Sequence, residues 1–122
     1  QLAQIIDDNE IINYDLLEVK YLKVLRAKEQ KDLRNLNKEY YLVDAVVDSF
    51  GGVGKRIALE WFEDIDCSRL ILAGGLTSAN LKEIDGFGFY GVDVSSGVES
   101  DIKGKKDRAK MIAFLKEANE IK

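Results

Sequence analysis

Short apolar runs of strand length alternate along the chain with longer segments whose apolar residues recur at helical spacing. The runs have the pattern of buried strands bounded by polar or glycine-rich turns, and they cover 2–6, 21–25, 40–43, 70–73 and 90–94. The segments that follow them have the spacing of amphipathic helices, over 10–17, 29–36, 57–62, 78–84 and 107–121. Alternation of this kind is typical of β-α units around a parallel sheet. The pattern therefore predicts an α/β chain with repeated β-α units.

Composition limits both the size of the fold and the class of partner. The chain has 122 residues and is expected to form one domain over 1–122, although a closed α/β barrel needs about 200 to 250 residues. The net charge of −4 argues against a nucleic-acid partner, and no apolar run approaches the length that crosses a membrane. The single cysteine, Cys67, suits a reducing compartment, so a cytoplasmic location is expected. Because histidine is absent, the commonest transition-metal ligand is missing, and neither a metal nor a cofactor is expected.

Three glycine-containing segments stand out, namely 50–55 (FGGVGK), 73–76 (AGGL) and 93–99 (DVSSGVE). The second and third come directly at the end of predicted strands. Glycine lets a backbone turn sharply and approach a ligand closely, because no Cβ intervenes. Two such turns on neighbouring parallel strands would form a cradle of backbone N–H groups suited to a phosphate. The first segment does not match a P-loop, because Lys55 is followed by Arg56 in place of Ser or Thr.

The ordered set resembles the C-terminal part of the phosphoribosylanthranilate isomerase family of tryptophan biosynthesis. Segment 93–99 matches one family signature without change, and segment 73–80 is similar to a second with three departures. Segment 42–45 (LVDA) resembles the family strand that ends in an aspartate, and 104–107 (GKKD) resembles the motif that follows the last signature. The resemblance implies a TIM (β/α)8 barrel, of which this chain supplies about units four to eight.

The resemblance also implies an isomerase that performs an Amadori rearrangement of N-(5'-phosphoribosyl)anthranilate. In this reaction the furanose ring opens and an aldose derivative becomes a ketose, which requires a general acid at the ring oxygen and a base at C2. The family strand that carries the catalytic cysteine is not among these residues. Cys67 is no substitute, because it precedes a strand and so lies at the end of a barrel opposite the active-site loops.

The 122-residue chain alone is therefore expected to be inactive. Its expected partners are the small phosphoribosyl substrate and either its own missing N-terminal segment or a second copy of the chain. Three alternative interpretations stay open. The first is a non-catalytic phosphate-binding half-barrel, the second is a fragment that functions only with a complementing chain, and the third is a related phosphoribosyl-binding barrel enzyme.

Asp44 is the candidate general acid. A carboxyl at the carboxyl end of a buried strand is partly desolvated, which raises its pKa and lets it hold a proton near neutral pH. The alternative role for Asp44 is to cap the turn into the following loop. Asp48 is the second candidate acid, because some relatives with shorter loops would place the aspartate there.

The other candidates concern substrate binding. Asp93 either orders the turn that follows it or positions substrate hydroxyls, and Lys23 either lines the barrel mouth or is solvated. A mobile lid is expected around Gly51, Gly52 and Gly54, with an ordinary surface loop as the alternative. The lysine-rich segment 103–110 is interpreted as a solvated helix start. The predicted phosphate ligands, for which tight turns are the alternative, are Gly74, Gly75, Ser95, Ser96 and Gly97.

Overall fold

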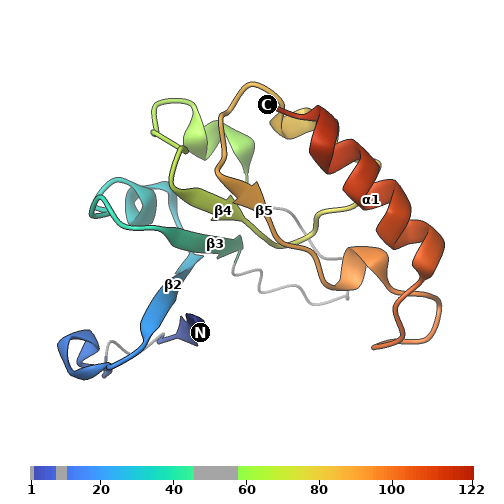
Figure 1. The fold of residues 1–122 in the computed structure, drawn as a ribbon. Coiled ribbons are helices and arrows are strands. Elements are labelled where there is room, and N and C mark those ends of the chain that lie inside the picture. Colours follow the sequence, from blue (N-terminus) through green and yellow to red (C-terminus); the bar gives the residue numbers. More distant parts are fainter. Residues whose placement is uncertain (1, 8–10, 46–57) are drawn as a thin grey trace.

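The computed structural model describes residues 2–7, 11–45 and 58–122. Among these residues it contains one parallel sheet in the strand order β1-β2-β3-β4-β5 (Figure 1). The five predicted strands are confirmed, and their ends differ from the predicted ones by no more than two residues. The strands are β1 (Leu2–Ile6), β2 (Lys20–Ala27), β3 (Tyr41–Ala45), β4 (Leu70–Leu72) and β5 (Gly91–Val92).

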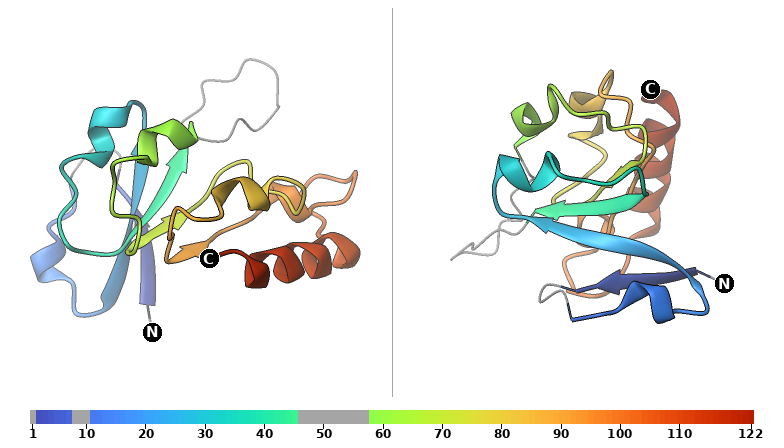
Figure 2. Two further views of the ribbon diagram at one scale, coloured as in Figure 1. Left: turned by 90° about the horizontal axis from the view of Figure 1, so that it is seen from above. Right: turned by 90° about the vertical axis from the view of Figure 1, so that its left-hand side faces the viewer.

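The strand order follows the chain order, and this determines where the connections lie. Right-handed crossovers that always advance in one direction place every connection on the same face of the sheet. The buried core lies on that face, where Val43 and Leu72 of the sheet share one apolar cluster with Phe62 of a connection. Figure 2 shows the twist of the sheet from β1 toward β5. A twisted parallel sheet of this order, covered on one face, is the arrangement of (β/α) barrels.

Among the described residues, the helical parts of the connections are shorter than the predicted helices. Most contain a single 3₁₀ turn closed by an i→i+3 hydrogen bond, as when the Leu17 N–H donates to the Tyr14 carbonyl at 3.1 Å. Segments this short do not repay the cost of starting an α-helix. The predicted helices over 29–36 and 78–84, and over the described part of 10–17, are therefore wrong in type and extent, and the described part of 57–62 is wrong in type. The 3₁₀ turns are η1 (Tyr14–Leu16), η2 (Gln30–Leu33), η3 (Leu59–Phe62), η4 (Leu81–Ile84) and η5 (Ser96–Val98).

Within the described ranges, α1 (Arg108–Glu120) is the one α-helix, as predicted for the C-terminal segment. Asp107 caps it, because its carboxylate accepts a hydrogen bond from the Lys110 backbone N–H at 3.0 Å. Phe114 anchors the helix in the core with 4% of its surface exposed. A second apolar stripe remains uncovered, formed by Met111, Ile112 and Leu115.

The outer strands β1 and β5 end the sheet among the described residues. Apolar side chains at both ends are exposed, with 66% of Leu2 and 63% of Tyr90 accessible to solvent. Outer strands carry a row of backbone groups that can pair with further strands. Both ends of the sheet are therefore suited to extension.

Candidate active site at the carboxyl end of the sheet

The carboxyl ends of β3, β4 and β5 meet around one pocket. Backbone hydrogen bonds from Ala73 to the Val43 carbonyl (2.9 Å) and from Asp93 to the Leu72 carbonyl (2.8 Å) hold these ends together. The pocket has a volume of about 200 Å³. It brings together seven of the predicted site residues. Its lining consists of Asp44, Ala73, Gly74, Gly75, Leu76, Asp93, Val94, Ser95, Ser96 and Gly97.

The first arm of the pocket is the turn after β4. Gly74 and Gly75 have φ angles of 87° and 67°, a backbone conformation that other residues rarely adopt. The side chain of Asn80 holds this turn in place through two hydrogen bonds. Its side-chain amide donates to the Gly75 carbonyl at 2.9 Å, and its carbonyl oxygen accepts from the Thr77 N–H at 2.9 Å. The turn is thus fixed by both backbone conformation and a side chain.

The second arm is the turn after β5, and it packs directly on the first. A Cβ at Gly97 would overlap the backbone carbonyl oxygen of Leu76. Only glycine allows the two backbones to approach this closely. The two arms therefore form one unit, in which a shift of either arm displaces the other.

Asp44 lies on the face of the sheet opposite the core cluster. Side chains alternate between faces along a strand, and the preceding residue, Val43, is fully buried in the core on the other face. Asp44 is the register partner of Arg26, so these two side chains leave the sheet on the same side. Asp93 continues β5 and lines the same pocket as Asp44. The pocket thus combines two carboxyl groups with two backbone turns.

Lys23 lies elsewhere, on the face of the sheet that carries the core. It is the register partner of Tyr41, which precedes Asp44 by three residues in β3, and an odd number of residues along a strand reverses the face. Its ammonium is 3.1 Å from the Glu39 carboxylate and 4.5 Å from the centre of the Tyr14 ring. Burial opposes the charged form of Lys23, but the hydrogen bond and charge of Glu39 outweigh it and raise the pKa.

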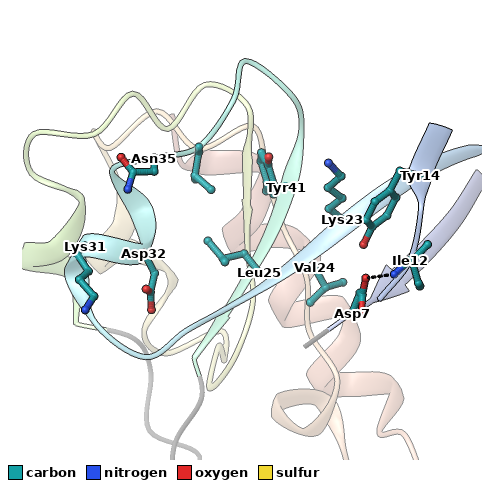
Figure 3. Close-up of a pocket in the computed structure, with 11 residues that line it drawn as sticks. Asp7, Ile12, Tyr14, Lys23, Val24, Leu25, Lys31, Asp32, Asn35 and Tyr41 are labelled. Carbon is teal, nitrogen blue, oxygen red and sulfur yellow. Dashed lines mark hydrogen bonds between the residues drawn. The ribbon is translucent and has the colours of Figure 1, made fainter. Parts of the chain in front are cut away.

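Lys23 contributes to a separate, wider cavity of about 580 Å³ (Figure 3). That cavity includes Asp7, whose carboxylate accepts the Ile12 backbone N–H at 2.9 Å. The structure therefore does not bring Lys23 together with Asp44 and the glycine turns.

Some predicted positions lie outside the described residues. These are the second candidate acid, Asp48, and the predicted lid glycines, Gly51, Gly52 and Gly54. Across 2–7, 11–45 and 58–122, no group of three or more His, Cys, Asp or Glu residues is placed to hold a metal ion. In the same part of the chain, no helix has the length and apolar character needed to cross a membrane.

Cys67 lies before β4, at the end of the sheet opposite the pocket, as predicted. Its side chain is 2% exposed. Burial, with a smaller contribution from the charge of Asp66, raises the pKa of the Cys67 thiol to about 11. Because only the thiolate is a strong nucleophile, this cysteine is inert at neutral pH.

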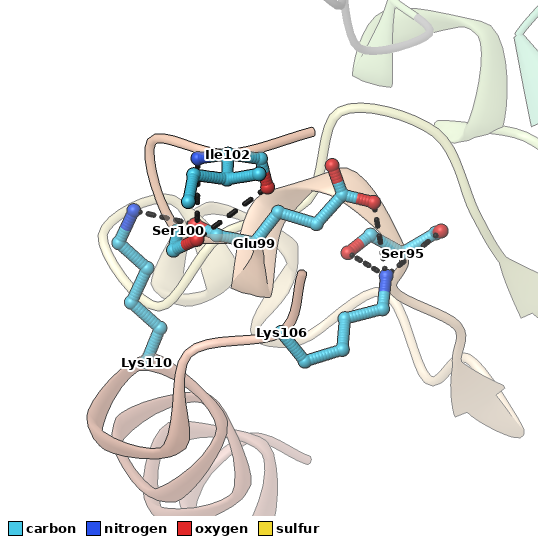
Figure 4. Close-up of polar contacts among 6 residues, drawn as sticks. All are labelled: Ser95, Glu99, Ser100, Ile102, Lys106 and Lys110. Atoms are coloured by element: carbon cyan, nitrogen blue, oxygen red, sulfur yellow. Dashed lines mark hydrogen bonds and ion pairs between the residues drawn. The ribbon is translucent and has the colours of Figure 1, made fainter. Parts of the chain in front are cut away.

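Lys106 contacts the second arm from outside (Figure 4). Its ammonium donates to the Ser95 carbonyl at 2.8 Å, to the Ser95 hydroxyl at 3.2 Å and to the Glu99 carboxylate at 3.2 Å. Neither this contact of Lys106 nor the role of Asn80 was predicted from the sequence. A lysine in a charged segment is usually solvated, so the spacing of Lys106 gave no sign of a partner. The signal that could have found both was their place in the two matched segments, 73–80 and 104–107.

Replacing Asn80 by alanine is expected to loosen the first arm. The change leaves the Gly75 carbonyl and the Thr77 N–H without their side-chain partner. Loss of two neutral hydrogen bonds in a partly exposed position should lower the free energy of unfolding by about 1–2 kcal/mol. Urea denaturation measures this loss. Asn35→Ala, a change of the same type at an exposed position, is the control, and equal stability of the two variants would contradict the role of Asn80.

The chain is similar to known isomerases in sequence. A family model described as N-(5'phosphoribosyl)anthranilate (PRA) isomerase matches residues 6–117. The N-(5'-phosphoribosyl)anthranilate isomerase of a Nitratiruptor species is 53% identical over 117 residues, which make up 96% of this chain and 59% of that protein. The chain spans about three fifths of the length of the curated relatives that it matches.

Solved structures agree with the sequence match. Phosphoribosyl anthranilate isomerase from Thermus thermophilus superposes with a TM-score of 0.72 at 22% identity over 98% of this chain and 61% of that one, a likeness of fold. A phosphoribosyl anthranilate isomerase in complex with reduced 1-(o-carboxyphenylamino)-1-deoxyribulose 5-phosphate gives a TM-score of 0.57 at 30% identity, covering 84% of this chain and 50% of that one. Since the family model covers nearly the whole chain, the chain belongs to the N-(5'-phosphoribosyl)anthranilate isomerase family.

Proposed function

We propose that the gene product carrying this chain isomerises N-(5'-phosphoribosyl)anthranilate in tryptophan biosynthesis. This proposal rests on one observation, namely that Asp44 and both glycine-containing arms line the same pocket. A sugar phosphate substrate needs a grip on its phosphate and an acid near its ring oxygen, and the pocket offers groups for both. Membership of an isomerase family supports the same reaction.

The two arms form the phosphate subsite in this proposal. Backbone N–H groups of the turns at Gly74–Gly75 and Ser95–Gly97 donate to phosphate oxygens, and the serine hydroxyls add further donors. The family member solved with a reduced deoxyribulose 5-phosphate ligand supports a ligand of this class. Asp93 would repel a phosphate dianion in direct contact, so its proposed role is to accept hydrogen bonds from the sugar hydroxyls.

Asp44 is the proposed general acid. It donates a proton to the furanose ring oxygen as the bond from that oxygen to C1 breaks, and the nitrogen lone pair forms a C=N bond in compensation. A base then removes the C2 proton, which gives an enolamine. The protonated base returns this proton to C1, and the C2 hydroxyl becomes a ketone as its own proton passes to the Asp44 carboxylate, which restores the acid. In this proposal the described residues supply the general acid and the phosphate subsite. The base is not assigned to any of them.

The five strands are proposed to correspond to units four to eight of the barrel, within one domain over 1–122. The sequential strand order and the coverage of about three fifths of the relatives support this correspondence. The outer edges of β1 and β5 then pair with the remaining strands of the barrel, supplied by the same gene product or by another chain. A cytoplasmic location stays a prediction.

The test is an assay of the gene product with N-(5'-phosphoribosyl)anthranilate, following consumption of the substrate. The chain itself, and the chain joined to the N-terminal part of the Nitratiruptor isomerase, are assayed beside it. Turnover that is lost in Asp44→Asn supports the proposal. Phosphate binding without turnover in the gene product would contradict it and favour a non-catalytic phosphate-binding half-barrel.

A further inference from the structure

We propose that Lys106 is a positioning residue of the phosphate subsite, which holds Ser95 so that its hydroxyl proton and the next peptide N–H serve the ligand. The inference rests on the proposed function, because it assigns a role within the proposed phosphate subsite. Lys106 itself does not line the pocket, whereas Ser95 and Ser96 do. Its effect on a ligand therefore passes through the turn that it holds.

The hydrogen bonds of the Lys106 ammonium show why it acts indirectly. An ammonium group has three N–H donors and no acceptor. The Ser95 carbonyl, the Ser95 hydroxyl and the Glu99 carboxylate account for all of them (Figure 4). No donor is left for a phosphate oxygen. The ammonium is instead a fixed positive charge within hydrogen-bond distance of Ser95.

These contacts determine which way Ser95 donates. Because Lys106 can only donate, the Ser95 oxygen must be the acceptor in their 3.2 Å hydrogen bond. The hydroxyl proton therefore points elsewhere and can reach a ligand. The C=O and N–H of a trans peptide point in opposite directions, so fixing the Ser95 carbonyl toward Lys106 directs the Ser96 N–H away from it. Lys106 thus orients the Ser95 hydroxyl, and together with the Val98 N–H, which donates to the same Ser95 carbonyl at 3.4 Å, it fixes the direction of the Ser96 N–H.

Lys106 is held in place by the backbone of its own segment. Glu99 and Lys106 form an antiparallel bridge, and the Asp107 N–H donates to the Val98 carbonyl at 2.8 Å. A hydrogen bond from the Gly104 backbone, and then the Lys106 ammonium, lower the pKa of the Glu99 carboxyl, so Glu99 is ionised at neutral pH. Segment 99–107 is therefore a fixed support for the ammonium.

Lys110 is the matched control that the structure offers. Its ammonium donates to the backbone carbonyl of Glu99 at 2.7 Å, so both lysines contact Glu99, but Figure 4 draws no interaction between Lys110 and Ser95. Lys110→Met and Lys106→Met remove the same charge from the same region. A difference between the two variants therefore reports the contact with Ser95, and an equal effect reports net charge.

The experiment titrates the chain with inorganic phosphate and follows the amide resonances of Ser95, Ser96 and Gly97 by NMR. Lys106→Met should weaken phosphate binding by about tenfold or more, the effect of losing an oriented hydrogen bond to a charged group, while Lys110→Met should change it little. Ser95→Ala should have a similar effect. The double variant should lose little more than either single one, because Lys106 acts through Ser95. In the gene product, Lys106→Met should raise KM with kcat nearly unchanged.

Each outcome distinguishes the two proposals. If phosphate leaves these amide resonances of the wild-type chain unmoved, the proposed phosphate subsite fails, and the inference on Lys106 fails with it. If the wild type binds but Lys106→Met matches Lys110→Met, or the losses from Lys106→Met and Ser95→Ala add fully, the role of Lys106 is overturned while the phosphate subsite stands. If circular dichroism shows that Lys106→Met does not fold, the phosphate affinity of Ser95→Ala is the test. An affinity equal to that of the wild type would then overturn the inference.

Discussion

Asp44→Asn is expected to lower kcat of the gene product by about 10²- to 10⁴-fold, with little change in KM. Asparagine has nearly the same shape as aspartate but carries no acidic proton, so the variant can bind the substrate without protonating the ring oxygen. The carboxyl lies in the pocket at the end of β3, on the face opposite the core, so the change should leave folding intact. Steady-state kinetics with N-(5'-phosphoribosyl)anthranilate, together with a thermal melt, measures both quantities.

Asp93→Asn is the matched control, since it removes the other carboxyl group of the same pocket. It is expected to act mainly on KM, because hydrogen bonds to sugar hydroxyls form in the ground state as well as in the transition state. An effect of Asp44→Asn confined to KM would show that Asp44 is a binding or capping residue. A larger fall in kcat for Asp93→Asn than for Asp44→Asn would exchange the two proposed roles.

Gly97→Ala is expected to lower the free energy of unfolding by about 1–3 kcal/mol and to abolish measurable phosphate binding. The added methyl group would occupy the position of the Leu76 carbonyl oxygen, so one arm of the pocket must move away from the other. Backbone atoms cannot give way as the tip of a flexible side chain does. Urea denaturation measures the stability, and the phosphate titration by NMR measures the binding.

Gly91→Ala provides the comparison, at a glycine of β5 that does not line the pocket. A Cβ there would lie 3.8 Å from a side-chain carbon of Ile71, an ordinary van der Waals contact. This variant should keep its stability and its phosphate binding. If Gly97→Ala is equally well tolerated, the two arms do not interlock as described, and the pocket is more adaptable than its backbone contacts indicate.

The sheet and most of the pocket could be predicted from the sequence, because both depend on local patterns. Strand-length apolar runs predicted β1 to β5, and glycine turns at strand ends predicted the two arms. The position of Lys23 could not be predicted, because it depends on the parity of its place in β2 relative to Asp44 in β3. Register between strands is a property of the assembled sheet, and a difference of one residue exchanges its faces.

The helical segments and Lys106 illustrate a second limit. The apolar residues of 29–36 and 78–84 recur at helical spacing, and both segments contain a helical turn. This spacing does not determine whether a short connection forms α or 3₁₀ turns. Lys106 follows Ser95 by eleven positions and reaches it only because 99–107 folds back on the turn. A contact of this kind depends on tertiary structure. The charged composition of 103–110 therefore predicted only that the lysine is solvated.

The buried thiol of Cys67, before β4, allows local opening of the core to be measured by its reaction with a thiol reagent. Cys67 is the single cysteine of the sequence and is 2% exposed, so a thiol reagent can react only when the amino end of β4 separates from its neighbours. The labelling rate therefore measures how often this region of the core opens under native conditions. Since Cys67 lies at the end of the sheet opposite the pocket, a change in that rate on ligand binding would report whether tightening at one end of the sheet stabilises the other.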